Sequence, residues 1–125
     1  MINVVFEADG NDISRILSTY KVVKEVEYES ITTMDKVEWY YDYTIRTSVV
    51  ASFVPMNEKD LSSLYRILSK KFVTLKYTDQ NTGTVDTKQF VVFSNMESFF
   101  LLKNAYDENY YSGYEVEFRA VVADA

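Results

Sequence analysis

The side chains that most often carry out chemistry in proteins are missing from this sequence. It contains no histidine and no cysteine. Histidine is the commonest general base near neutral pH and the commonest metal ligand, and cysteine supplies thiolates for catalysis and zinc binding. Acid–base chemistry would depend on carboxylates, and a zinc or copper site would need carboxylates alone, which those metals disfavour. We expect no catalytic residues, no cofactor and no metal site.

The carboxylates are numerous but scattered along the chain. Glu25, Glu27 and Glu29 alternate with other residues, which on a strand places neighbours about 7 Å apart on one face. Such a row could bind a cation or a basic partner, or could be a solvated strand face. Residues 107–109 (Asp-Glu-Asn) could hold calcium, but their spacing is not that of a calcium-binding loop, and a polar loop is the simpler interpretation. No spacing favours a glycosidase carboxylate pair.

Aromatic residues are the more informative feature, because they form 16% of the chain and exceed what one small core needs. Successive strand residues point to opposite faces, so Tyr40 and Tyr41 cannot share one core. Surplus rings could anchor a protein interface, pack on the core and sheet edges, or stack on sugars. We predict that seven rings form an assembly interface: Trp39, Tyr40, Tyr41, Tyr43, Tyr106, Tyr110 and Tyr111.

One segment, residues 57–71, has helical periodicity. Its apolar stripe falls at i, i+3, i+4 and i+7: Leu61, Leu64, Tyr65 and Leu68. Asn57 is suited to cap the first turn, and Lys70 and Lys71 would complement the dipole at the other end. A single amphipathic helix must bury its stripe on another element, so we expect it to dock on a β-sheet.

The remaining chain alternates as β-strands do. Strands are expected at residues 2–6, 20–29, 39–54, 72–78, 84–93 and 114–122, with turns at 9–12 and 79–83. Residues 13–19 fit either a helical turn or a loop. Residues 30–37 and 103–113 are expected to be loops, and 94–102 to extend the preceding strand past a kink. Strand 39–54 exceeds the usual length, which predicts a bend or bulge, with Trp39, Tyr41, Tyr43, Ile45 and Val49 on one face.

These elements predict one domain over residues 1–125. We expect an antiparallel β-sandwich or small barrel of about six or seven strands with one flanking helix over 57–70. Strands this long exceed what one small sandwich covers, so a hairpin arm should project around residues 28–42.

The net charge of −6 repels phosphates and argues against nucleic-acid binding. No apolar run is long enough to span a membrane, and the first residues lack a signal peptide, so cytoplasmic synthesis is expected.

The order of elements resembles small tail structural proteins of Gram-positive bacteriophages and prophages, which share the tail-tube and tail-hub fold. The matching features are the aromatic strand ending in Phe53-Val54-Pro55, the capped helix over 57–70, strand 72–76, and then Tyr77, Asp79 and Gly83. The resemblance covers about residues 2–122.

This resemblance implies a non-enzymatic virion protein of the phage tail, as a tube, hub or terminator subunit. Its expected partners are copies of itself in a hexameric or trimeric ring, and other tail proteins. Its expected location is the virion tail, after synthesis in the cytoplasm of the host bacterium. The alternative is a carbohydrate-binding β-sandwich that uses its exposed rings; a small β-barrel enzyme that uses carboxylates is a third hypothesis.

Overall fold

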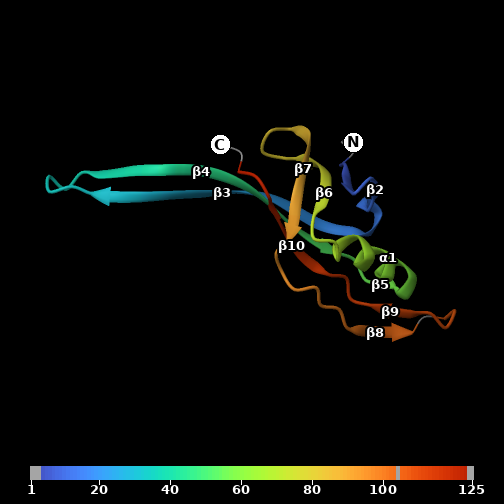
Figure 1. The fold of residues 1–125 in the computed structure, drawn as a ribbon. Helices are drawn as coiled ribbons and strands as arrows, with labels where there is room; N and C mark the ends of the chain where they lie inside the picture. The colour runs from blue at the N-terminus through green and yellow to red at the C-terminus, as the bar shows by residue number, and fades with distance from the viewer. Residues whose placement is uncertain (1–3, 104, 124–125) are drawn as a thin grey trace.

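A computed structural model describes residues 4–103 and 105–123 of the chain. Within these residues, ten strands form two antiparallel sheets beside one α-helix (Figure 1). The prediction of a mainly β, sandwich-like fold with one flanking helix is confirmed. The larger sheet contains β1 (Phe6–Ala8), β2 (Asn11–Asp12), β3 (Leu17–Thr32), β4 (Glu38–Phe53), β6 (Val73–Asp79), β7 (Thr84–Val92) and β10 (Glu115–Ala120). The smaller sheet contains β5 (Met56–Asn57), β8 (Phe100–Lys103) and β9 (Asn109–Tyr111).

The larger sheet curls around the core. Its strand order is β2-β1-β6-β7-β10-β4-β3, so β3 lies at one edge. The Tyr20 hydroxyl on β3 nevertheless donates to the Thr78 carbonyl of β6 at 2.7 Å, and the side-chain amide of Asn81 donates to the Val22 carbonyl at 3.2 Å. The rings of Phe6 and Tyr20 also meet, with centroids 5.1 Å apart. Side chains therefore join the edge strand to the other end of the sheet.

Helix α1 (Glu58–Leu68) closes one side of this core. The Asn57 side chain accepts a hydrogen bond from the Asp60 amide at 2.9 Å, so the predicted N-cap is confirmed. Leu64 and Leu68 are buried. Tyr65 is exposed, so its predicted place in the buried stripe is wrong. The buried stripe of the helix is therefore narrower than predicted.

The helix ends at Leu68, earlier than predicted. The chain leaves the helix at Ser69, whose amide still bonds the Tyr65 carbonyl at 2.8 Å, because it must turn into β6. The two following lysines therefore lie outside the helix. Lys70 forms an ion pair with Asp9 at 3.0 Å, and Lys71 lies over a neighbouring aromatic ring.

Two tight turns match the sequence prediction. Asp9 and Gly10 form the two-residue loop between β1 and β2, with φ of 50° and 82°. Gly83 has φ of 72° between β6 and β7, and its amide donates to the Asp79 carbonyl at 2.8 Å. Positive φ at these positions suits hairpin turns. The ambiguous segment 13–19 contains a 3₁₀ turn at Ser14–Ile16 followed by the start of β3.

Other boundaries differ from the prediction. The first strand begins at Phe6, not residue 2; residues 2 and 3 lie outside the described part, and the Val5 amide bonds the Thr78 hydroxyl at 3.0 Å. Segment 94–102 does not continue β7, and the supposed loop 103–113 contains β9. The strand count exceeds six or seven because β2, β5, β8 and β9 have only 2, 2, 4 and 3 residues, too few to show alternation.

We expect Leu64→Asp to lower the free energy of unfolding by about 3 kcal/mol or more, because it places a charge without a partner in the core. Tyr65→Asp, one position further along, is the matched control and should cost less than about 1 kcal/mol, because that side chain is exposed. Denaturant titration measures both values. An unchanged transition for Leu64→Asp would show that the helix does not pack on the core.

Candidate functional site

The strands β3 and β4 form a hairpin that extends well beyond the rest of the domain (Figure 1). Each strand has 16 residues. Val22 and Val49 are buried where the hairpin crosses the body, but every residue from 26 to 43 is exposed. We call residues 26–43 the arm. These bounds are close to those of the projecting hairpin expected from the sequence, residues 28–42.

The predicted loop at residues 30–37 is shorter than expected, because its first three residues belong to a strand. β3 continues to Thr32, and only residues 33–37 turn. The Thr33 amide donates to the Val37 carbonyl at 3.0 Å, and the Asp35 carboxylate accepts from the Thr33 hydroxyl and from the Val37 amide. These hydrogen bonds lower the pKa of Asp35, the Thr33 hydroxyl most strongly. Local side chains thus hold the tip in one conformation, a feature that hydrophobic alternation does not reveal.

A bulge interrupts the arm, as strand length predicted. Glu27 pairs with Thr44, but the next pair is Glu29 with Tyr41, so β4 has one residue more than β3 in this interval. Asp42 lies in the bulge with φ of 52°. An extra residue inverts the alternation of side chains beyond it.

The bulge corrects one prediction about the faces of the arm. Trp39, Tyr41, Ile45 and Val49 do not share a face: Trp39 and Tyr41 pair with odd-numbered residues of β3, whereas Ile45 and Val49 pair with even-numbered ones. The aromatic side chains near the tip are therefore divided between the two faces.

One face of the arm continues the core-facing side of the sheet into solvent. Val22, on this side, is 5% exposed, whereas Val26 and Tyr28 further along are 48% and 52% exposed. The Tyr40 ring packs edge-on against Tyr28, with centroids 4.9 Å apart. The other face presents Trp39 beside its cross-strand partner Ile31. Each face thus has an apolar surface that the domain does not cover.

The exposed apolar surface of the arm is as large as one side of a stable protein interface. Nine large apolar side chains contribute: Val26, Tyr28, Ile31, Met34, Val37, Trp39, Tyr40, Tyr41 and Tyr43. At roughly half exposure, each adds about 100 Å², or on the order of 900 Å² together. This sum covers both faces of the arm, and a standard interface buries about 800 Å² per partner.

A polar cluster fixes the base of the arm. Asp79 is buried, with Lys24 Nζ at 3.1 Å from one carboxylate oxygen and the Asn81 amide at 2.9 Å from the other. Thr47 accepts from Lys24 and Lys88 at 3.0 and 3.3 Å. Burial alone would raise the pKa of Asp79, but the Asn81 amide and the Lys24 ammonium together hold it below its usual value. The cluster links the β3–β4 hairpin to β6 and β7.

On the outer face of the same region, the carboxylate row has a partner within the chain. Arg119 Nη2 lies 3.2 Å from Glu25 and 3.0 Å from Glu27. Arg46 donates to the Ala120 carbonyl at 2.8 Å. Part of the row that could have bound a cation or a basic partner therefore attaches the arm to β10.

The second aromatic group lies elsewhere, on the β8–β9 hairpin. Tyr106 is exposed, whereas Tyr110 and Tyr111 are half-buried. The Tyr111 hydroxyl donates to Glu58 at the helix start at 2.6 Å, which lowers the pKa of Glu58 and raises that of Tyr111. Sequence reasoning missed the neighbouring residues 99–102 (Phe-Phe-Leu-Leu), all exposed. Four successive apolar residues were the available signal.

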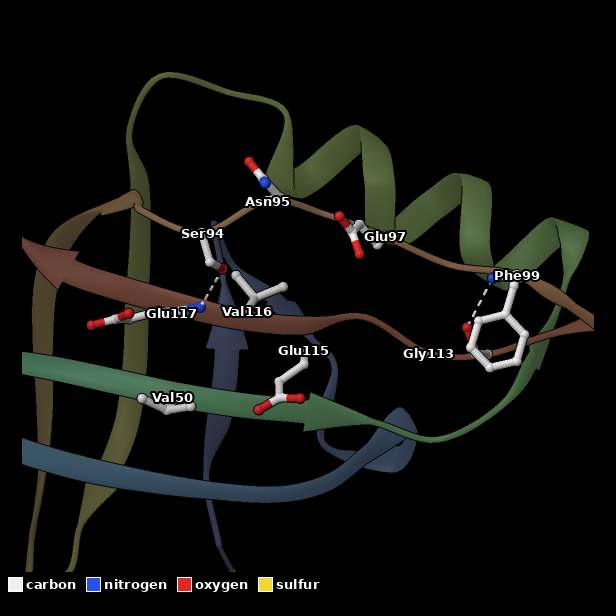
Figure 2. A pocket seen from close by; sticks show the side chains of 10 residues that line it. Val50, Ser94, Asn95, Glu97, Phe99, Gly113, Glu115, Val116 and Glu117 are labelled. Carbon is white, nitrogen blue, oxygen red and sulfur yellow. Dashed lines mark hydrogen bonds between the residues drawn. The ribbon is translucent and has the colours of Figure 1, made fainter.

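A groove of about 500 Å³ lies between segment 94–99 and the strands β4 and β10. Its acidic side chains are Glu97, Glu115 and Glu117, and Figure 2 shows their carboxylates well apart from one another. Ser94 accepts from the Glu117 amide at 2.9 Å, so its hydroxyl is part of the fold. These residues form neither a carboxylate pair nor a nucleophile–base pair.

Among residues 4–103 and 105–123, no group of three or more acidic side chains is arranged to hold a metal ion. Asp107, one of the candidate calcium ligands, forms an ion pair with Lys103 at 3.2 Å. No helix in the described part of the chain has the length and apolar character needed to cross a membrane.

Comparison with known proteins gives no relative: no family model matches the sequence, and neither the curated proteins nor the solved structures include a match. Function is therefore inferred from the surfaces of this chain.

Asp79 should make stability depend on pH. The native pKa of Asp79 is lowered from the ordinary 3.8. The contribution of its carboxylate to the free energy of unfolding is therefore fully present above pH 3.8 and is lost as the pH falls through the native pKa. We expect Asp79→Asn to lower the free energy of unfolding at pH 7 by about 1–3 kcal/mol. The free energy of unfolding of this variant should also decrease less as the pH is lowered. Asp86→Asn on β7 is the control and should preserve that dependence. A full acid dependence in Asp79→Asn would contradict the assignment.

Proposed function

We propose that this chain is a non-enzymatic structural subunit that assembles with copies of itself, and that the arm is its assembly element. The observation that supports the proposal is the exposure of nine large apolar side chains on both faces of the arm. Covering about 900 Å² of such surface would contribute roughly 20 kcal/mol of apolar transfer free energy before the costs of association. A second copy would supply the covering surface.

The construction of the arm supports this proposal. Hydrogen bonds among residues 33–37 hold the tip, and the ion pair of Lys24 with Asp79 holds the base. An arm that is ordered before binding loses less conformational entropy when a partner covers it. Its order would therefore favour assembly.

We propose further that the assembly is a ring of a phage tail, as a tube, hub or terminator subunit that also contacts other tail proteins. The resemblance in element order supports this, as does a mainly β body with one helix and a projecting hairpin. A net charge of −6 would favour a channel lining that repels DNA and lets it pass. The virion tail is the corresponding location.

The carbohydrate-binding alternative receives less support from the geometry. Sugar rings stack on aromatic faces that are presented together, but strand alternation places Trp39 and Tyr41 on the face opposite to Tyr40. A partner that contacts both faces of the hairpin would use all of these rings. A protein surface can do so.

Removal of the arm tests the proposal. We design a variant in which Asn-Gly replaces residues 28–43 and joins Glu27 to Thr44, which are paired across the hairpin. It should remain folded, with a parent-like far-UV spectrum, and stay monomeric at concentrations where the parent forms rings. Sedimentation and electron micrographs provide the measurement.

Lys36→Gly is the matched control, because Lys36 has φ of 64° and glycine accepts that conformation without loss of the arm. It should assemble as the parent does. Intact rings from the shortened variant would refute the role of the arm, and unfolding of that variant would show that the arm belongs to the core. A parent that stays monomeric at all concentrations would refute self-assembly itself.

A further inference from the structure

The strand β8 forms an unprotected edge at the far side of the molecule. The small sheet has the order β5-β9-β8, so within the described residues β8 has a strand neighbour on one side only. Residues 99–102 are exposed by 65%, 56%, 40% and 55%. The edge has a register irregularity between Phe100 and Leu102 but no proline, and its first charged residue is Lys103. Exposed apolar edges of this kind aggregate unless a partner covers them.

The side chains of this edge are apolar on both of its faces. Phe100 pairs with Tyr111 and Leu102 pairs with Tyr110, two successive residues of β9 that point to opposite sides, so Phe100 and Leu102 lie on opposite faces. Phe100 packs edge-on against Tyr111 at 5.9 Å between centroids and still remains more than half exposed. A partner that covered one face alone would leave the other in water. The edge is therefore suited to an added strand, which would cover both faces.

The arm has an edge with the same properties. β10 pairs with β4 only through residues 48–52, so within the described residues the β4 edge of the arm has no strand beside it. This edge carries four large rings, Trp39, Tyr40, Tyr41 and Tyr43, beside Glu38 and Asp42, whereas the β3 edge carries one ring, Tyr28, with Val26 and Ile31 beside Glu27 and Glu29. The β4 edge is thus the more apolar of the two, and its rings also lie on both faces.

The two edges lie at opposite ends of one molecule. In Figure 1 the arm leaves the body on one side and the β8–β9 hairpin leaves it on the other. They cannot meet within a copy. Two different surfaces at opposite ends produce head-to-tail contacts, which close into rings or continue as filaments.

We propose that β8 of one copy pairs with the β4 edge of the arm of the next copy. The inference depends on the proposed self-assembly and adds the surface that receives the arm. A contact between two β8 edges would leave the arm uncovered, and a contact between two arms would leave β8 uncovered. The head-to-tail contact covers both apolar edges with one interface and aligns apolar side chains on both faces.

Cysteine cross-linking tests this pairing, because the chain has no cysteine of its own. Single cysteines are placed in separate proteins, either on the arm at Glu38, Tyr40 or Asp42, or on β8 and the residue before it at Phe99, Leu101 or Lys103. Each arm variant is mixed with each β8 variant, assembled under reducing conditions and then oxidised. Neighbouring strand positions lie within disulfide range. We expect at least one arm–β8 pair to cross-link, whereas Ser62→Cys on the exposed side of α1 should not cross-link with either set.

A substitution at β8 gives a second measurement. Leu101→Glu should raise the concentration needed for assembly at least about tenfold while the far-UV spectrum stays unchanged. Ser62→Glu is the control and should assemble as the parent does. Parent-like assembly of Leu101→Glu would contradict the inference.

The outcomes separate the two proposals. Rings that form without any arm–β8 cross-link would overturn this pairing but leave self-assembly standing. Cross-links between two β8 cysteines alone would overturn it in favour of a symmetric contact. Absence of any association in the parent would overturn both proposals.

Discussion

The β3–β4 hairpin is longer than the body that could cover it, and the rest of the structure depends on this mismatch. A seven-stranded sheet and one short helix bury the base of the hairpin, where Val22 and Val49 lie in the core. Beyond residue 26 the same apolar pattern continues without cover. Apolar side chains at regular strand spacing gain free energy only when something removes them from water. This uncovered surface is the one that the proposed self-assembly would bury.

The other features of the fold keep this uncovered segment ordered. Asp79 and Lys24 anchor its inner face, Arg119 holds Glu25 and Glu27 on its outer face, and the 33–37 turn fixes its tip. These contacts replace the hydrophobic packing that stabilises strands in a core. They also place the aromatic side chains in fixed positions before any partner arrives, so less ordering remains to oppose binding.

Much of the fold could be predicted because its signals are local. The Asn57 cap, the turns at Gly10 and Gly83, and the need for a bulge each depend on a few neighbouring residues. The position of the bulge at Asp42 could not be predicted, since no glycine marks it, and so the faces of Trp39 and Tyr41 were misassigned. The small sheet escaped detection because its strands are very short and side chains such as Glu58 hold it in place. The ion pairs of Arg119 join segments far apart in sequence, which no local pattern encodes.

The central claim is that the arm becomes buried between copies of the chain. Hydrogen–deuterium exchange of the intact protein, measured across a range of concentrations, tests it most directly. We expect amides of residues 26–43 and of β8 to become protected as the concentration rises, while amides of the core strand β6 keep the same protection throughout. Arm amides that exchange equally fast at every concentration, in samples that sedimentation shows to be assembled, would contradict the account.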